Sequence, residues 1–274
     1  MTETTDPTMT ETTDPTRTET TDPTRTETTD PTRTDAKPTF VLVHGAFADA
    51  SGYHGLISGL EADGFTVVAP PNPLRALASD AASIRTRVAA IDGPVVLVGH
   101  SYAGAVISHA VDGLDNVIGL VYLAAFALEV GESCLSAQDG YTPSLLATEN
   151  APTPYDAPGA PGGPDLYINP GRFREVFCGD SSDELARTMY ATQRPLSAFA
   201  FTEAATVRGW DRKPTWYLVS NDDNSIPPQL QRDMAARMNA HTEDIDASHT
   251  AFVAHPKRVA DFVERAAKDF AERD

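Results

Sequence analysis

From residue 40 onward, two hydrophobic patterns alternate along the chain. Short runs that are apolar at every position, such as 40–43 and 95–98, are followed by longer stretches with apolar residues at helical spacing, such as 51–62 and 79–91. A short run without polar alternation predicts a strand that is covered on both faces. Strands that alternate with helices predict a parallel sheet with right-handed crossovers. The pattern therefore predicts an α/β fold.

The same patterns place the individual elements. Strands are predicted over 40–43, 65–69, 95–98, 117–123, 215–219 and 242–246. Helices are predicted over 51–62, 79–91, 102–111, 228–239 and 256–271, and Gly64 has the position of a C-cap after the first of them. We expect a mostly parallel sheet of about six strands that is flanked by helices.

The alternation breaks between residues 127 and 213, after the fourth predicted strand. This segment contains a Pro- and Gly-rich stretch at 151–170, followed by helical patterns at 182–191 and 196–204. A long insertion in a sheet protein is typically a lid or a binding region. The predicted organisation is one α/β domain over 37–274, with a helical lid at 127–213.

The first 32 residues are four copies of an eight-residue unit, x-Thr-Glu-Thr-Thr-Asp-Pro-Thr. Every copy contains a proline and almost no apolar side chain, so the segment cannot bury enough surface to offset its conformational entropy. Residues 1–36 are therefore predicted to form a disordered repeat leader.

Composition and charge argue against several classes of function and partner. The 274 residues carry a formal net charge of −18, which leaves no excess of Lys or Arg for phosphates and argues against a nucleic-acid partner. No apolar run approaches the ~20 residues that span a bilayer, and the N-terminus has no signal-like segment, so we expect a cytoplasmic protein without a membrane partner. Cys134 and Cys178 belong to no CxxC or Cys/His cluster, which favours free thiols over a bridge.

The candidate chemistry centres on Gly99-x-Ser101-x-x-Gly104, where the strand at 95–98 passes into the helix at 102–111. The pattern places a serine on a sharp strand-to-helix turn, with its hydroxyl at the carboxyl end of the sheet and near the positive end of a helix dipole. Such a serine can be a nucleophile when a base and an oxyanion hole lie nearby. Taken alone, the pattern also fits an ordinary turn serine.

Three further features lie at the ends of predicted strands. His44-Gly45-Ala46-Phe47 follows the first strand, and a backbone N–H of this loop can point at the same place as the N–H of Tyr102. The acidic loop at 221–224 follows the strand at 215–219, and Ser248-His249-Thr250 precedes the last helix. Because parallel strands share one carboxyl edge, these groups are predicted to meet there, in the chain order Ser, Asp, His.

On these motifs, residues 39–271 resemble the α/β-hydrolases, and most of all the small esterase branch that includes plant methylesterases and hydroxynitrile lyases. The matching segments are His44-Gly45-Ala46, Gly99-His100-Ser101-Tyr102-Ala103-Gly104, Asp223-x-x-Ile226-Pro227 and Ser248-His249. The resemblance implies that Ser101 is the nucleophile, His249 the general base and Asp223 the acid that orients the imidazole. It also implies an oxyanion hole made by the backbone N–H groups of Ala46 and Tyr102.

Asp222 is the rival for the role of the acid, and the Asp-x-x-Ile-Pro spacing favours Asp223. The sequence contains no HExxH, EF-hand or GxGxxG motif, and the chemistry of such a triad needs no metal or organic cofactor.

The resulting interpretation is a serine hydrolase that cleaves a small carboxylic ester through an acyl-enzyme. Hydroxynitrile lyase activity is the main alternative, although those enzymes are associated with a lysine beside the catalytic histidine and Thr250 stands there instead. A slow-turnover ligand receptor, a cofactor-free dioxygenase and a perhydrolase can be built on the same triad and fold. The sequence does not identify the natural substrate. It also does not determine the oligomeric state, for which a homodimer is one alternative.

Apolar side chains near these loops and in the insertion are candidates for an apolar substrate pocket, although packing between lid and core accounts for some of them. The substrate-binding candidates are Phe47, Phe126, Leu128 and Phe199. Further lid residues with this potential are Tyr141, Leu145, Leu146, Phe173, Phe177, Tyr190 and Phe201.

Overall fold

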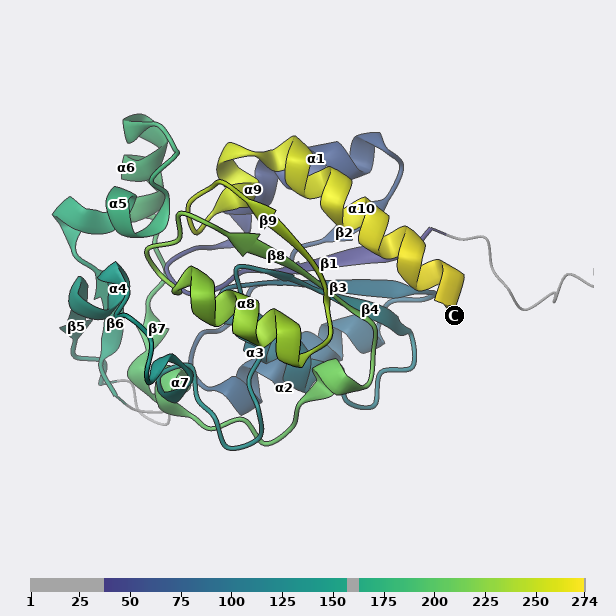
Figure 1. Cartoon of the computed structure of the whole chain (residues 1–274), viewed down its shortest axis with the longest axis horizontal. Helices are drawn as coiled ribbons and strands as arrows, with labels where there is room; N and C mark the ends of the chain where they lie inside the picture. Colours follow the sequence, from purple (N-terminus) through teal and green to yellow (C-terminus); the bar gives the residue numbers. More distant parts are fainter. Residues whose placement is uncertain (1–36, 157–162, 274) are drawn as a thin grey trace, which may run out of the picture. The chain divides into compact units, whose positions relative to one another are not determined.

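A parallel sheet of six strands forms the centre of the computed structural model, which describes residues 37–156 and 163–273 (Figure 1). The strands lie side by side in the order β2-β1-β3-β4-β8-β9. They are β1 (Thr39–Val43), β2 (Thr66–Val68), β3 (Val95–His100), β4 (Val117–Leu123), β8 (Thr215–Ser220) and β9 (His241–Ile245). The predicted α/β fold is confirmed, and every strand boundary lies within two residues of its predicted place.

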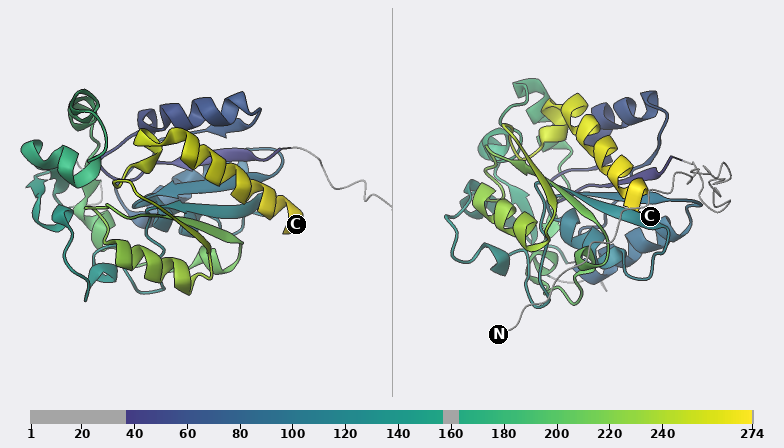
Figure 2. Two further views of the ribbon diagram at one scale, coloured as in Figure 1. Left: turned by 45° about the horizontal axis from the view of Figure 1, so that its top comes forward. Right: turned by 45° about the vertical axis from the view of Figure 1, so that its right-hand side comes forward.

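Helices cover both faces of this sheet (Figure 2). One layer consists of α1 (His54–Ala62), α9 (Ala251–Ala254) and α10 (Pro256–Arg273), and the other of α2 (Leu77–Ala89), α3 (Ala103–Ala110) and α8 (Pro228–Arg237). In β1, Phe40 and Leu42 pack in the core of the first layer, whereas Val41 and Val43 pack in the core of the second. Burial on both faces explains why the strands are apolar at every position.

Most of the insertion between β4 and β8 lies beyond the carboxyl ends of the strands (Figure 1). Its described residues contain four short α-helices: α4 (Leu145–Thr148), α5 (Phe173–Phe177), α6 (Asp183–Ala191) and α7 (Ala198–Thr202). It also contains a small antiparallel sheet that the sequence patterns did not predict, with the strands β5 (Asn150–Thr153), β6 (Asp165–Ile168) and β7 (Leu196–Ser197). The helical pattern at 196–204 therefore begins as a strand and becomes helical only at α7.

Backbone hydrogen bonds join this insertion to the rest of the domain. The Ser197 N–H donates to the carbonyl of Leu74 at 3.0 Å, and the Phe47 N–H donates to the carbonyl of Arg194 at 2.8 Å. The insertion is thus attached to the two loops that follow β1 and β2.

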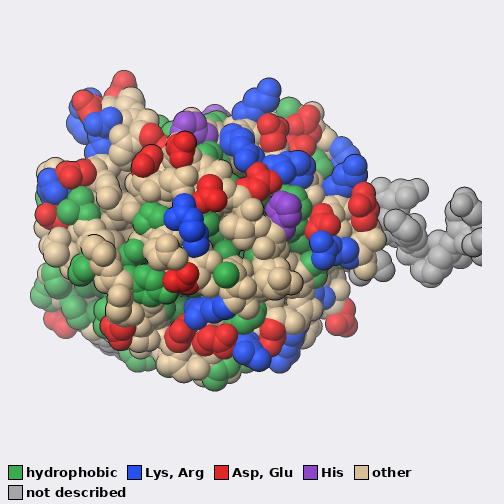
Figure 3. All heavy atoms as spheres, viewed as in Figure 1, with side chains coloured by type: hydrophobic (Ala, Val, Ile, Leu, Met, Phe, Trp, Pro, Cys, Tyr) green, Lys and Arg blue, Asp and Glu red, His purple; other side chains and the backbone are tan. Residues whose placement is uncertain are grey.

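The predicted leader at 1–36 lies outside the described residues. No helix within 37–156 and 163–273 is long and apolar enough to cross a membrane. On the face shown in Figure 3, basic and acidic side chains are interspersed and the basic ones do not gather into one patch.

Candidate active site

The turn that carries Ser101 is held in a strained conformation by close packing. Ser101 has a φ of 55°, in the left-handed region that non-glycine residues rarely adopt. Its carbonyl accepts hydrogen bonds from the N–H groups of Gly104 and Phe126, both at 3.0 Å. A Cβ atom at Gly104 would lie 2.4 Å from the carbonyl oxygen of Phe126, so α3 can approach this segment only without a side chain there. Ser101 stays at the end of β3 with 8% of its surface exposed.

The loop after β1 lies directly against this turn. A Cβ atom at Gly45 would be 2.8 Å from Cβ of Ser101 and 2.7 Å from the carbonyl oxygen of His100. The close approach brings the backbone of Ala46 to the nucleophile. Within the described residues, neither the N–H of Ala46 nor that of Tyr102 donates to another protein atom. Both groups predicted to form an oxyanion hole are therefore available.

His44 fixes the shape of this loop. The Asn72 N–H donates to Nε2 of His44 at 3.0 Å, so the ring proton is on Nδ1, which donates to the carbonyl of Gly45 at 2.9 Å. The Asn72 side chain also donates to the carbonyl of His44 at 3.0 Å. Burial lowers the pKa of His44, which agrees with a neutral ring that both donates and accepts. His44 therefore has a structural role.

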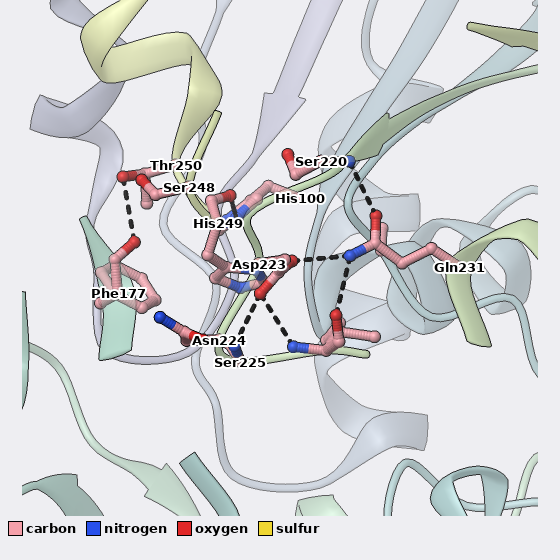
Figure 4. Close-up of polar contacts among 12 residues, drawn as sticks. His100, Phe177, Ser220, Asp223, Asn224, Ser225, Gln231, Ser248, His249 and Thr250 are labelled. Carbon is pink, nitrogen blue, oxygen red and sulfur yellow. Dashed lines mark hydrogen bonds and ion pairs between the residues drawn. The ribbon is translucent and has the colours of Figure 1, made fainter. Parts of the chain in front are cut away.

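His249 and Asp223 meet as a buried pair. Nδ1 of His249 donates to Oδ2 of Asp223 at 2.7 Å, and the two residues are only 1% and 6% exposed (Figure 4). Asp223 lies in the loop after β8, and His249 lies in the loop between β9 and α9. The rival acid, Asp222, is exposed to solvent. The structure thus brings together the two residues favoured by the sequence motifs.

Three other groups hold the carboxylate of Asp223 in place. Its Oδ1 accepts hydrogen bonds from the N–H groups of Ser225 at 2.6 Å and Ile226 at 2.9 Å. Its Oδ2 accepts a further hydrogen bond from Nε2 of Gln231 at 2.7 Å (Figure 4). Gln231 is itself held by the Ser220 N–H, which donates to its Oε1 at 3.1 Å. Sequence reasoning missed Gln231, because a glutamine on an amphipathic helix carries no motif.

The other ring nitrogen of His249 faces no protein partner. Its Nε2 is buried and has no hydrogen bond within the described residues, so it can accept a proton. The Ser101 hydroxyl therefore does not donate to it in this structure; such contacts often shorten when a substrate binds. Nε2 of His100 donates to the backbone carbonyl of His249 at 3.0 Å, and the ring of Phe177 lies 5.3 Å from that of His249. The neighbouring groups orient the imidazole but leave its basic nitrogen available.

The insertion also contacts the loop that carries His249. The Ser248 N–H donates to Oδ2 of Asp180 at 3.0 Å, and the Ser248 hydroxyl donates to Oδ1 of the same carboxylate. The Thr250 hydroxyl donates to the carbonyl of Phe177 at 3.2 Å (Figure 4). Asp180 was not predicted, because its contact depends on how the insertion folds over the sheet edge.

A cavity of about 310 Å³ lies between the insertion and the loop after β1. Of the four predicted substrate-binding residues, Phe47 lines it. Phe126 and Leu128 are buried in the core and Phe199 is 44% exposed, and none of these three belongs to its lining. The lining consists of Phe47, Leu135, Gln138, Asp139, Tyr141, Thr142, Pro143, Ser144, Leu146, Ala147, Asn150, Leu166, Leu196 and Phe201.

In the part of the chain that the structure describes, neither a metal cluster nor a disulfide is present. Within residues 37–156 and 163–273, no group of three or more His, Cys, Asp or Glu side chains could hold a metal ion. Cys134 and Cys178 are free thiols, and both are buried.

Known proteins share this fold and sequence pattern. The chain matches the model of the alpha/beta hydrolase family over residues 40–262. An alpha/beta hydrolase from Aspergillus novofumigatus is 26% identical over 259 residues, which cover 86% of this chain and 99% of the relative. A pyrethroid hydrolase from Sphingobium wenxiniae is 28% identical over 260 residues, which cover 85% of this chain and 87% of the relative.

A solved structure shows the same fold. The crystal structure of polyneuridine aldehyde esterase superposes with a TM-score of 0.73 at 21% identity, covering 84% of this chain and 100% of that one. Since the family model matches most of the chain, and the structure has the fold that the motifs predicted, the chain belongs to the alpha/beta hydrolase family.

Proposed function

We propose that this protein is a serine hydrolase that cleaves carboxylic esters through an acyl-enzyme on Ser101. The observation that carries the proposal is the buried His249–Asp223 pair, whose free Nε2 lies at the same sheet edge as the strained Ser101 turn. A base oriented by a buried carboxylate, together with a nucleophile on such a turn, is the arrangement that acyl transfer requires.

The reaction follows from these groups. Nε2 of His249 takes the proton of the Ser101 hydroxyl while the oxygen attacks the ester carbonyl. The N–H groups of Ala46 and Tyr102 stabilise the oxyanion of the tetrahedral intermediate, and Asp223 stabilises the imidazolium. His249 then gives its proton to the departing alcohol, which leaves an acyl group on Ser101. A water molecule, deprotonated by His249, attacks the acyl group. His249 then gives this proton to the Ser101 oxygen as the acid leaves, which restores the free enzyme.

The names of the relatives support this class of reaction. One relative is called a pyrethroid hydrolase and one structural neighbour an esterase. The lyase alternative has less support, because the position after His249 is Thr250, whose hydroxyl is bonded to the insertion.

The cavity beside Phe47 indicates the charge and polarity of the groups in the substrate ester. Its walls are mostly apolar, and Asp139 is the one charged side chain among the described residues that line it. An anionic group would be repelled there and an apolar group would be desolvated favourably. We propose that the substrate is a neutral ester with an apolar group that fits a cavity of about 310 Å³.

The test is ester hydrolysis combined with labelling of the nucleophile. A series of p-nitrophenyl esters of increasing acyl length is assayed with the wild type, with Ser101→Ala and with Ser79→Ala, which alters an exposed serine on α2. We expect hydrolysis and labelling by a fluorophosphonate in the wild type and in Ser79→Ala, and neither in Ser101→Ala. Release of cyanide from mandelonitrile without ester cleavage would favour the lyase, and stoichiometric ligand binding without turnover would favour the receptor.

A further inference from the structure

A carboxyl group outside the triad is buried beside the nucleophile turn. Asp80, in the first turn of α2, is completely buried, and within the described residues it forms no ion pair. The nearby guanidinium of Arg75 binds Asp165 instead, at 2.7 Å. Burial raises the pKa of Asp80. A buried carboxyl without a cation is costly, so its presence needs a reason.

The hydrogen bonds of Asp80 lead to the active site. Its two oxygens accept the N–H of Arg75 at 3.2 and 3.1 Å. Its Oδ2 also accepts the hydroxyl of Tyr102 at 2.9 Å. Burial raises the pKa of Tyr102 well above its ordinary value, so the phenol keeps its proton and remains the donor.

Tyr102 links this carboxyl to the reaction through its backbone. It directly follows Ser101, stands at the N-cap of α3 and contributes one of the two proposed oxyanion N–H groups. Its side chain is buried and extends to α2, where Asp80 holds its end. The peptide group between Ser101 and Tyr102 comes directly after the positive φ of Ser101. Such a strained backbone conformation persists only when the surrounding structure holds it from several sides.

We infer that Asp80 is a positioning residue for the oxyanion hole. By holding the Tyr102 hydroxyl, it fixes the peptide N–H of Tyr102 in the direction where the oxyanion forms. A donor of this kind is effective only when it is already aimed at the developing charge. The inference rests on the proposed function, since it assigns a role within ester hydrolysis.

The test removes the hydroxyl group of Tyr102 and compares this variant with a matched control variant. Tyr102→Phe deletes the hydrogen bond to Asp80 and leaves the ring in place. Tyr53→Phe is the control, because Tyr53 is equally buried and its hydroxyl donates to the carbonyl of Val43 at 2.9 Å, on the other face of the sheet from Tyr102. Kinetic constants for a p-nitrophenyl ester, the affinity for an alkylboronic acid as a transition-state analogue, and urea unfolding are measured for each.

We expect kcat of Tyr102→Phe to fall about tenfold, with KM within about twofold. Complete loss of an oxyanion-hole donor lowers kcat about 10²–10³-fold, and a donor that is only misdirected lowers it less. Affinity for the boronic acid should fall by a similar factor. Tyr53→Phe should keep both values while losing comparable stability. Asp80→Asn should lower kcat in the same direction, and the double variant with Tyr102→Phe should lose less than the product of the two single effects.

Two results would overturn the positioning role in an active enzyme. One is an unchanged kcat and an unchanged boronic acid affinity in Tyr102→Phe. The other is an equal loss in Tyr53→Phe, which would show a general effect of lost core hydrogen bonds. A wild type without Ser101-dependent hydrolysis would instead overturn the proposed function, and this inference with it.

Discussion

At the scale of single residues, Asp222 and Asp223 are neighbours with opposite environments. Asp222 is exposed, whereas Asp223 is buried and accepts hydrogen bonds from His249, Gln231 and two backbone N–H groups. A carboxylate can stabilise a cationic imidazole strongly only where water does not screen it. The two residues have the same side chain, and only burial in the folded protein distinguishes them. The sequence does not contain this information directly.

Exchange of each aspartate for asparagine tests this distinction. Asp223→Asn is expected to lower kcat about 10⁴-fold, because an amide no longer holds the reactive tautomer of His249. Asp222→Asn should leave kcat within about twofold, since exposed substitutions away from a site have small effects. Steady-state hydrolysis of one p-nitrophenyl ester measures both, and equal losses in the two variants would show that the acid is misassigned.

Gln231 makes a residue-scale prediction for stability. Its amide bonds Asp223, the carbonyl of Ile226 and the N–H of Ser220, all in buried surroundings. Gln231→Leu would remove one hydrogen bond from each of these groups, which costs about 1–3 kcal/mol for each buried group that is left unpaired. We expect a lower urea midpoint with an unchanged slope, together with a reduced kcat. Gln229→Leu, on the exposed side of the same helix, should leave the midpoint unchanged.

The site residues that the sequence predicts and the neighbouring residues that it does not predict differ in a physical way. Ser101, His249 and Asp223 were predicted because each occupies a local motif at a strand end, and parallel topology brings such ends together. Gln231 and Asp180 act only through contacts between segments far apart in the chain. Phe177 was predicted only as a lid residue, and its place beside His249 follows from the fold of the insertion.

At the scale of elements, periodicity predicted the central sheet better than the insertion. The six parallel strands have apolar runs that identify them, and α10 has a long amphipathic pattern. The strands β5, β6 and β7 have only two to four residues, so little periodicity can develop in them. Their pairing depends on tertiary contacts, such as the ion pair between Asp165 of β6 and Arg75.

The contact between α3 and the segment after β4 gives an element-scale prediction. Gly104→Ala would place a methyl group 2.4 Å from the carbonyl oxygen of Phe126 and 2.8 Å from Cβ of Ala125. Backbone must move to relieve this overlap, so we expect a loss of about 1–3 kcal/mol and a large fall in kcat as the Ser101 turn opens. Gly171→Ala, with no atom within 4 Å of the new Cβ, is the control. Urea unfolding that shows equal stability for both variants would contradict this account of the turn.

At the scale of the whole molecule, three buried histidines have surroundings that favour the neutral imidazole. The rings of His44 and His109 each accept a backbone N–H at Nε2, from Asn72 and Thr206 respectively. Their Nδ1 atoms donate to backbone carbonyl groups. His100 donates from Nε2 to the carbonyl of His249. Protonation would remove the acceptor atoms of the first two and place a charge in the core for all three.

This arrangement determines how stability depends on pH. Burial lowers the pKa of His44 and His109 below the ordinary value of 6.5, and lowers that of His100 well below it. As the pH falls through 6.5, the unfolded chain takes up protons that the folded protein does not, so stability falls. Asp80 and Glu264, whose pKa values are raised above the ordinary 3.8 and 4.5, act in the opposite sense. Their contribution to stability is fully present below those ordinary values and is lost as the pH rises through the raised pKa values.

Urea unfolding at pH 7.5 and 5.5 should therefore show a lower free energy of unfolding at pH 5.5. Each histidine contributes a slope of at most about 1.4 kcal/mol per pH unit, so the three together can remove several kcal/mol. His109→Gln keeps a side chain that can donate and accept but cannot titrate in this range, and it should reduce the slope. His54→Gln, which replaces an exposed histidine, should leave the slope unchanged. Equal stability of the wild type at both pH values would show that these rings do not remain neutral in the folded protein.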